Sequence, residues 1–293
     1  MSWLGRNKYI VGSAVAVAMI GYLLYRTFKK TGVLGIGGVK ATDWTNDKDY
    51  WMVDGSDLKS IGKGVSINMS RNTGLGNLFA DGNYQAVKNK SSVYWAVYDI
   101  TRDKLVASSK NANTNVYAAS VSKAVVVGAA YNNNGGKLPT TNDVGKAIRL
   151  LVVSDNNAWT PLQDLAGGSN AVNAFSDKMG YNNMKPARNG GNSINAVGMC
   201  LFWRDVLRNR FNGAESVFKI TSSCQTSNSR SRKYIPTTSL MGSKTGTYMQ
   251  YNHDSAWIQK GNNWYAITVL TDKNNGSEDV ALAFGGLFKE YCN

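Results

Sequence analysis

The chain of 293 residues contains three cysteines and one histidine, and these shortages exclude several kinds of site. Three cysteines are too few for a disulfide-based scaffold, and none belongs to a Cys-x-x-Cys pair of the kind that binds zinc. A single histidine, His253, argues against a histidine-based triad or a zinc centre, and we expect it to lie in a loop. The sequence therefore predicts no metal site and no bound cofactor.

The cysteines leave two arrangements open. If the domain is exported to an oxidising compartment, Cys200 and Cys224 are candidates for a disulfide that leaves Cys292 free. Unpaired, buried thiols are the alternative, and the sequence does not choose between them.

Acidic residues are scarce as well, since 19 Asp and Glu stand against 33 Lys and Arg and give a formal net charge of +14. A basic balance of this size suits an anionic neighbour such as an acidic cell-wall polymer or anionic lipid. No dense basic run occurs in residues 41–293, so we expect no nucleic-acid partner. The length and the 43% hydrophobic content are typical of a globular protein with one or two domains.

Charge is entirely missing from residues 9–25, and basic residues flank this run on both sides. A run of 17 residues is at the short end of the roughly 17–25 that span a bilayer. We therefore predict a single-pass transmembrane anchor over residues 1–30. Basic residues at both ends barely choose an orientation, and we place the folded domain periplasmic or extracellular because of the chemistry inferred below. A cleaved signal peptide with an Ala-x-Ala site at residues 16–18 is the alternative, which we disfavour because the apolar run continues through Leu24.

Residues 31–91 predict a glycine-rich linker followed by a spacer without a recognisable motif. We expect the folded domain over residues 92–293, with an α+β fold in which a helical subdomain is inserted into an antiparallel sheet flanked by helices. Residue patterns predict strands over 93–98, 105–107, 240–247, 255–259 and 264–270. They predict helices over 141–153, capped by Thr141 or Asn142, over 171–179, over 196–207, and from a Ser277 cap through Tyr291.

Three short elements carry residues suited to acyl transfer. In the first, Ser120 and Lys123 are three positions apart, so both lie on one face of a helical turn. An amine in an apolar wall beside a second cation loses its proton more easily, and the neutral amine accepts a proton from a serine hydroxyl. The spacing alone carries little weight, because Ser-x-x-Lys occurs by chance in many helices.

The other two elements follow in the chain. Ser154, Asp155 and Asn156 end the helix predicted over residues 141–153, where polar residues are also ordinary helix stops. Lys244, Thr245, Gly246 and Thr247 lie on a predicted strand, and a glycine there keeps the face of the strand open to a ligand. Taken singly, the last element is typical of an exposed strand end.

Together and in this order, the elements resemble the active site of penicillin-binding proteins and class A β-lactamases. The resemblance covers roughly residues 92–293, and it implies a β-lactamase/transpeptidase-like fold and a serine ester intermediate. It implies that the backbone N–H groups of Ser120 and Thr247 bind the developing oxyanion. It assigns catalytic roles to Ser120 as nucleophile, Lys123 as base, Ser154 as proton shuttle and Lys244 as carboxylate-binding cation, and substrate-binding roles to Asn156, Thr245, Gly246 and Thr247.

One feature of class A β-lactamases is missing, because no glutamate occurs between Ser154 and Glu215. Residues 184–193, where the resemblance places the base that hydrolyses the acyl-enzyme, contain no acid at all. We therefore predict a penicillin-binding D,D-peptidase that acts on D-Ala-D-Ala peptides of peptidoglycan or on β-lactams and releases β-lactams slowly. The alternatives are a class A-type β-lactamase and a non-catalytic, membrane-anchored binding or structural protein.

Overall fold

The computed structural model describes residues 83–222, 230–236, 239–273 and 275–292. The predicted anchor at residues 1–30, most of the predicted linker and Cys224 lie outside these residues. Within the described ranges, no helix is both long enough and apolar enough to cross a membrane.

The strands are β1 (Val93–Asp99), β2 (Lys104–Ser108), β3 (Val116–Tyr117), β4 (Ser193–Ile194), β5 (Met241–Tyr248), β6 (Tyr251–Lys260) and β7 (Asn263–Thr271). The helices are α4 (Asn83–Lys88), α5 (Lys123–Asn133), α6 (Thr141–Val152), the 3₁₀ turn η1 (Asn156–Ala158), α7 (Trp159–Leu165), α8 (Gly168–Lys178), α9 (Ala196–Leu207), α10 (Ala214–Ser222), α11 (Ser231–Tyr234) and α12 (Ser277–Tyr291).

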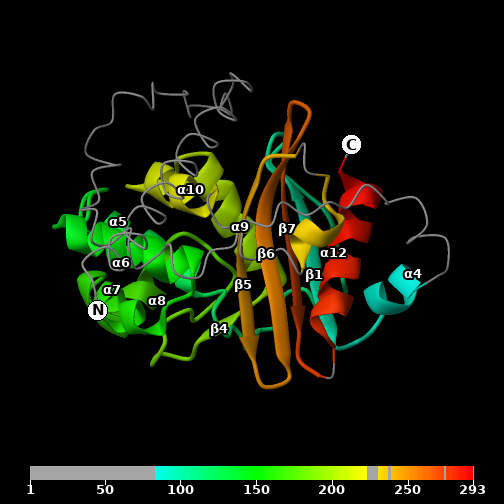
Figure 1. Ribbon diagram of the computed structural model, residues 1–293, viewed down its shortest axis with the longest axis horizontal. Coiled ribbons are helices and arrows are strands. Elements are labelled where there is room, and N and C mark those ends of the chain that lie inside the picture. The colour runs from blue at the N-terminus through cyan, green and yellow to red at the C-terminus, as the bar shows by residue number, and fades with distance from the viewer. Residues whose placement is uncertain (1–82, 223–229, 237–238, 274, 293) are drawn as a thin grey trace, which may run out of the picture.

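Five strands form an antiparallel sheet in the order β2-β1-β7-β6-β5 (Figure 1). The first and last strands of the chain pair at its centre, where Val97 of β1 lies opposite Ile267 of β7. The helices α5 to α10 are inserted between β2 and β5, as the sequence predicts. The short β3 and β4 form a separate two-stranded ladder beside this helical region.

Each face of the sheet is covered by helices, because alternate side chains of a strand point to opposite faces. In β1, Tyr94, Ala96 and Tyr98 pack into the core shared with α9 and the helical region. Trp95 and Val97 pack on the other face, against α12. The result is an α+β fold in three layers, with α12 and α4 on one side of the sheet and the inserted helices on the other (Figure 1).

The predicted sheet strands are confirmed, with shifted bounds. The helix over residues 196–207 is confirmed with the predicted bounds. Two predicted caps are wrong. The N-cap of α6 is Thr140, whose hydroxyl accepts a hydrogen bond from the Asp143 N–H at 3.1 Å. Thr140 has the extended backbone that a cap requires, whereas Thr141 already belongs to the helix. Ser277 likewise belongs to α12, and Gly276 is its N-cap.

The packed structure extends upstream of residue 92, where we expected the folded domain to begin. Tyr84 and Val87 of α4 are buried against α12. The Tyr84 hydroxyl donates to Glu290 at 2.9 Å, and Lys88 forms an ion pair with the same carboxylate at 2.8 Å. These contacts fix α4 to the C-terminal helix.

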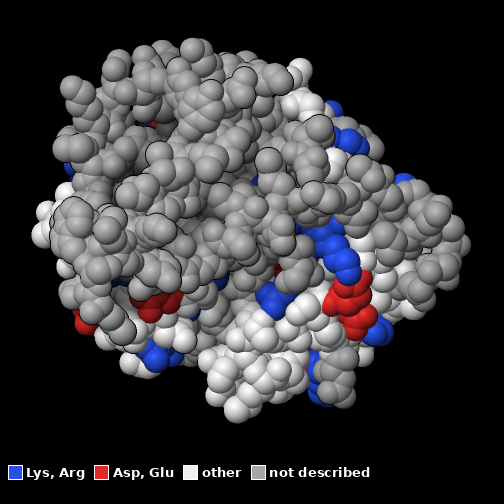
Figure 2. Space-filling view, viewed as in Figure 1, with Lys and Arg blue, Asp and Glu red and all other residues white. Residues whose placement is uncertain are grey.

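The two cysteines within the described ranges are free, buried thiols that lie in different cores. Cys200 on α9 belongs to the core on one face of the sheet, and Cys292 to the core on the other. Burial raises the pKa of the Cys200 thiol to about 12, so it stays protonated at neutral pH. On the face shown in Figure 2, basic and acidic side chains of the described part of the chain adjoin each other at the right.

Candidate active site

Ser120 lies in the turn that leads into α5 and is half-buried. The Lys123 N–H donates to the Ser120 carbonyl at 3.3 Å, so the two residues are one tight turn apart. Residue 119 before the serine has a left-handed backbone, with a φ of +49°. In α5 itself, nine consecutive residues from Lys123 to Tyr131 are buried, as expected for a helix that is apolar on all sides.

The amine of Lys123 is fully buried and is held by three oxygen atoms. Its Nζ lies 2.8 Å from the Ser154 carbonyl, 3.1 Å from Ser154 Oγ and 2.7 Å from Asn156 Oδ1. Burial and, next, the positive charge of Lys244 lower the pKa of Lys123 to about 7, while the Asp155 charge opposes them in part. About half of these amines are therefore neutral at pH 7, which is the form that accepts a proton.

Ser154 Oγ lies between the two amines, because Lys244 Nζ also lies 3.1 Å from it. The backbone of Ser154 is left-handed, with a φ of +59°, which is uncommon for a residue other than glycine. This conformation turns the chain at the end of α6 and brings Ser154 and Asn156 to the same amine. A hydroxyl that contacts two amines can pass a proton in either direction.

The Lys244 strand lies directly against the Ser120 turn. A Cβ atom at Gly246 would lie 2.9 Å from the Ser120 nitrogen and 3.0 Å from the Ala118 carbonyl, closer than real Cβ atoms approach. Glycine at this position therefore lets β5 pack closely against the turn, and the nearest atoms to its face belong to the turn. The Lys244 side chain is 2% exposed, and its Nζ also donates to the Thr245 carbonyl at 3.0 Å.

Two buried residues that the sequence does not single out support this arrangement. Arg230 donates to the Gly246 carbonyl at 3.3 Å, to the His253 carbonyl at 2.7 Å and to Thr247 Oγ1. Its guanidinium therefore adds a third cation to the end of β5 at which Thr247 lies. Neither spacing nor composition marks Arg230 in the sequence, because its partners are 16 to 23 residues away.

Asn192 supports the Ser120 turn from the opposite side. Its Oδ1 accepts from the Ser122 hydroxyl at 2.6 Å, and its Nδ2 donates to the Ala119 carbonyl at 3.3 Å. The Asn192 carbonyl accepts from the Ala118 N–H at 2.8 Å. The segment that we noted for its missing acid therefore holds the backbone before Ser120 and the Ser122 side chain after it.

A tryptophan lies near the Lys123 amine, and an arginine stacks on its ring. Lys123 Nζ lies 4.9 Å from the centre of the Trp159 ring, and Arg188 Cζ lies 5.5 Å from the same ring. The nearby Asp155 is engaged elsewhere, since its side chain accepts from the Asn157 N–H at 2.9 Å and lies 3.6 Å from Arg149. Within the described ranges, no group of His, Cys, Asp or Glu side chains is arranged to hold a metal ion.

His253 does not lie in the loop that we predicted but is buried near the start of β6. Its Nε2 lies 2.7 Å from the Tyr117 carbonyl, and its Nδ1 accepts from the Thr271 N–H at 3.1 Å. Because Nδ1 accepts, the ring is neutral and carries its proton on Nε2. It thus joins β3, next to the Ser120 turn, to the sheet.

Burial lowers the pKa of His253 to about 4, so we expect the folded state to keep this ring neutral where an unfolded chain is protonated. The unfolded state then binds more protons than the folded state between pH 6.5 and 4. The free energy of unfolding therefore falls by about 3 kcal/mol as the pH is lowered from 6.5 to 4. As the chain has one histidine, its NMR signal is unambiguous. Titration of that signal near pH 6.5 in the folded protein would contradict the buried, neutral ring.

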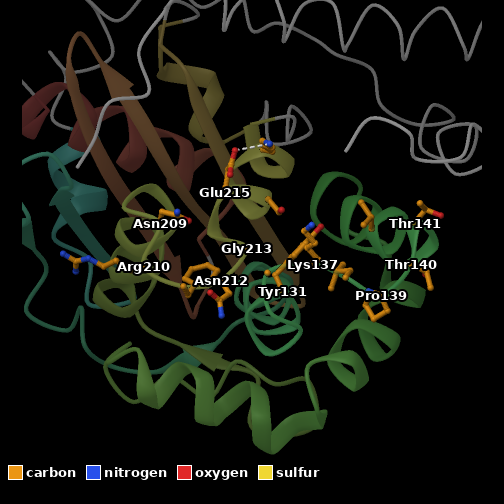
Figure 3. Close-up of a pocket in the computed structure, with 16 residues that line it drawn as sticks. Tyr131, Lys137, Pro139, Thr140, Thr141, Asn209, Arg210, Asn212, Gly213 and Glu215 are labelled. Carbon is orange, nitrogen blue, oxygen red and sulfur yellow. Dashed lines mark ion pairs between the residues drawn. The ribbon is translucent and has the colours of Figure 1, made fainter. Parts of the chain in front are cut away.

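A separate pocket of about 620 Å³ lies away from this site (Figure 3). Tyr131 lines it, and this residue is eight positions, or about 12 Å, along α5 from Lys123. Lys219 and Glu215 of α10 also line it and form an ion pair at 3.1 Å. None of the residues named for the acyl-transfer elements contributes to this pocket.

The fold and the two lysines that contact the Ser154 hydroxyl are typical of a serine hydrolase. Comparisons with known proteins indicate the same class. A model described as the Beta-lactamase enzyme family matches residues 137–287, more than half of the chain. The protein therefore belongs to the β-lactamase enzyme family and is a serine hydrolase of this type. The match includes the Ser154 and Lys244 elements, whereas Ser120 lies upstream of it.

Solved class A and other β-lactamases share the fold at low sequence identity. A β-lactamase from Xanthomonas campestris is 13% identical with a TM-score of 0.62, over 70% of this chain and 95% of that one. A β-lactamase from Desulfarculus baarsii is 14% identical with a TM-score of 0.61, over 74% and 98% of the two chains. A mutant class A β-lactamase of the last common ancestor of Gram-negative bacteria is 18% identical with a TM-score of 0.60, over 70% and 97%. No curated protein matches the sequence.

Proposed function

We propose that the protein is a membrane-anchored, penicillin-binding D,D-peptidase that forms an ester on Ser120 and releases β-lactam acyl groups slowly. The observation that carries this proposal is the environment of Lys123, a buried amine with a pKa of about 7. The nearby Asp155 is held by the Asn157 N–H and Arg149, and residues 184–193 contribute Arg188 and no acid. Such a site has a base for acylation and lacks the acid that would activate water for fast hydrolysis.

The resemblance implies a balanced sequence of proton transfers, and the contacts of Ser154 Oγ with both lysines support its second part. Neutral Lys123 takes the proton of the Ser120 hydroxyl while the Ser120 oxygen bonds to the acyl carbon of the substrate. The proton then passes through Ser154 Oγ, 3.1 Å from Lys123 Nζ, to the nitrogen of the breaking amide bond, and the amine leaves. The N–H groups of Ser120 and Thr247 stabilise the oxyanion, as the resemblance implies.

The substrate's carboxylate has a matching set of partners. Lys244 supplies charge and Thr245 and Thr247 supply hydroxyl groups at the same end of β5. Since Arg230 donates to Thr247 Oγ1, the Thr247 hydroxyl proton remains available to donate to a carboxylate. A peptide that ends in D-Ala-D-Ala and a penicillin both present a carboxylate on the leaving side of the amide bond.

The proposal also places the protein in the membrane, with its catalytic domain outside the cytoplasm. The uncharged run at residues 9–25 supports an anchor, and the substrates named above are found outside the cytoplasm. A transmembrane anchor predicts that the full-length protein remains with the membrane fraction after a high-salt or alkaline wash. Release of the whole population by either wash would contradict it.

The test of the proposal is the mass of the intact, full-length protein after incubation with benzylpenicillin. We expect one penicillin to add to the protein and to persist, Ser120→Ala to give no adduct, and Ser122→Ala to keep it. An adduct on Ser120→Ala would overturn the assignment of the nucleophile. Rapid hydrolysis of a chromogenic cephalosporin would favour an efficient β-lactamase, the activity named for the similar solved structures. A stable adduct without any peptidase activity would indicate a binding or sensing protein.

A further inference from the structure

Arg188 and Trp159 form a fixed pair beside the catalytic amine. Trp159 begins α7 and is 6% exposed. The main-chain N–H of Arg188 donates to Gln163 Oε1 at 2.8 Å, and its Nη1 donates to Thr160 Oγ1 at 3.2 Å. Both acceptors belong to α7, so this helix holds the arginine over the ring.

The guanidinium has donors left for a ligand. Arg188 is exposed, and within the described ranges no carboxylate lies at ion-pair distance from it. The Thr160 contact engages one of its five N–H groups, and stacking on an aromatic ring leaves the edge of the guanidinium open to a bidentate partner. Its charge also reaches Lys123, because it contributes to the lowered pKa of that amine.

The position of the pair relative to the reacting atoms identifies the part of the substrate that it meets. Lys244, on β5, lies at the end of the site that takes the carboxylate of the leaving group. The Trp159 ring lies 4.9 Å from Lys123 Nζ, and Asn156 Oδ1 lies 2.7 Å from the same amine. Because the resemblance assigns Asn156 to a carbonyl of the substrate, the pair lies near the residue that meets the acyl part.

We propose that Arg188, held on Trp159, binds a second carboxylate, located on the acyl side of the scissile bond. This inference rests on the proposed function and narrows its substrate class to acyl donors with an acidic acyl part, such as stem peptides with free side-chain or α-carboxylates. A charge-assisted, bidentate contact at this position selects such donors over neutral ones. Because residues 184–193 contain no acid, no carboxylate of this segment competes with the substrate carboxylate for Arg188. The same lack of acid accounts for the slow release of β-lactam acyl groups.

A matched pair of penicillins tests the subsite. Carbenicillin differs from benzylpenicillin by one carboxylate on the acyl side chain, and intact-mass kinetics give the acylation rate constant of the full-length protein for each. We expect Arg188→Gln to lower the carbenicillin-to-benzylpenicillin ratio by about 5–30-fold. The effect of Arg188 on Lys123 cancels in this ratio, because both penicillins use the same amine. Lys185→Gln is the control, since it removes a cation of the same segment that pairs with Asp177 at 2.7 Å.

Each outcome has one meaning. If both penicillins form adducts and the ratio in Arg188→Gln equals that of the wild type, the subsite is wrong and the proposed function stands. An equal fall of the ratio in Lys185→Gln also overturns the subsite, because general electrostatics would then explain it. If the wild type forms no adduct with either penicillin, the proposed function and the inference fall together.

Discussion

Replacing Lys123 with methionine is expected to slow acylation by benzylpenicillin by about 10²–10⁴-fold, the usual contribution of a general base. Methionine keeps a flexible, apolar side chain in the α5 wall and removes only the amine. In the wild type, the acylation rate falls as the pH drops below about 7, because the amine becomes protonated, and it is constant above that pH. Stopped-flow or quenched-mass measurements between pH 5 and 9 give both results.

The pH profile separates a base from a structural residue. The variant has no amine at this position, so we expect its residual rate to lose the change centred near pH 7. Lys219→Met is the matched control, because Lys219 is also a buried lysine but lies in the separate pocket on α10. Should Lys123→Met acylate at the wild-type rate with the same profile, another group is the base. Thermal unfolding of both variants checks that they fold.

Gly246→Ala is expected to slow acylation by about 10²-fold or more, although it adds a single methyl group. The new Cβ would lie 2.9 Å from the Ser120 nitrogen, 3.0 Å from the Ala118 carbonyl and 3.1 Å from Ala119 Cβ. None of these atoms is the end of a flexible side chain, so the Ser120 turn or β5 must move. A displacement of about 1 Å at a reacting group costs about this factor.

The glycine at the cap of α12 offers the control for this substitution. A Cβ at Gly276 has its nearest neighbour at 3.9 Å, and the backbone there is extended, so Gly276→Ala adds the same methyl group without a clash. We expect this variant to acylate like the wild type. Equal rates for Gly246→Ala and Gly276→Ala would show that the turn tolerates the methyl group and that the close approach is unimportant.

The predicted secondary structure is accurate where one pattern extends along a segment. Alternating and β-branched residues identified β1 and β7, and apolar spacing identified α6 and α9. The helices α7 and α10 were not predicted, because they are short and α10 contains Val217, Ile220 and Thr221, which have low helix propensity. Burial of the α10 side chains in the core outweighs that preference.

His253 shows the limit of the same reasoning. We predicted a loop at His253, yet this residue and its polar neighbours Asn252 and Asp254 lie in β6. Their side chains are satisfied by partners distant in sequence, such as the Tyr117 carbonyl, 136 residues from His253. A central strand can hold polar residues when each finds such a partner, and a local pattern does not reveal it.

The sequence by itself determined the family, the order of the three acyl-transfer elements and the helical turn between Ser120 and Lys123. These features depend on residue type and on spacing along one segment. Only the tertiary structure decided that Lys123 has a pKa near 7, that Arg230 and Asn192 support the site, and that Trp159 lies near this amine with Arg188 on its ring. The reason is physical, because the charge state of an amine depends on burial and on charges within a few ångströms, and the fold brings those groups from segments far apart in the chain.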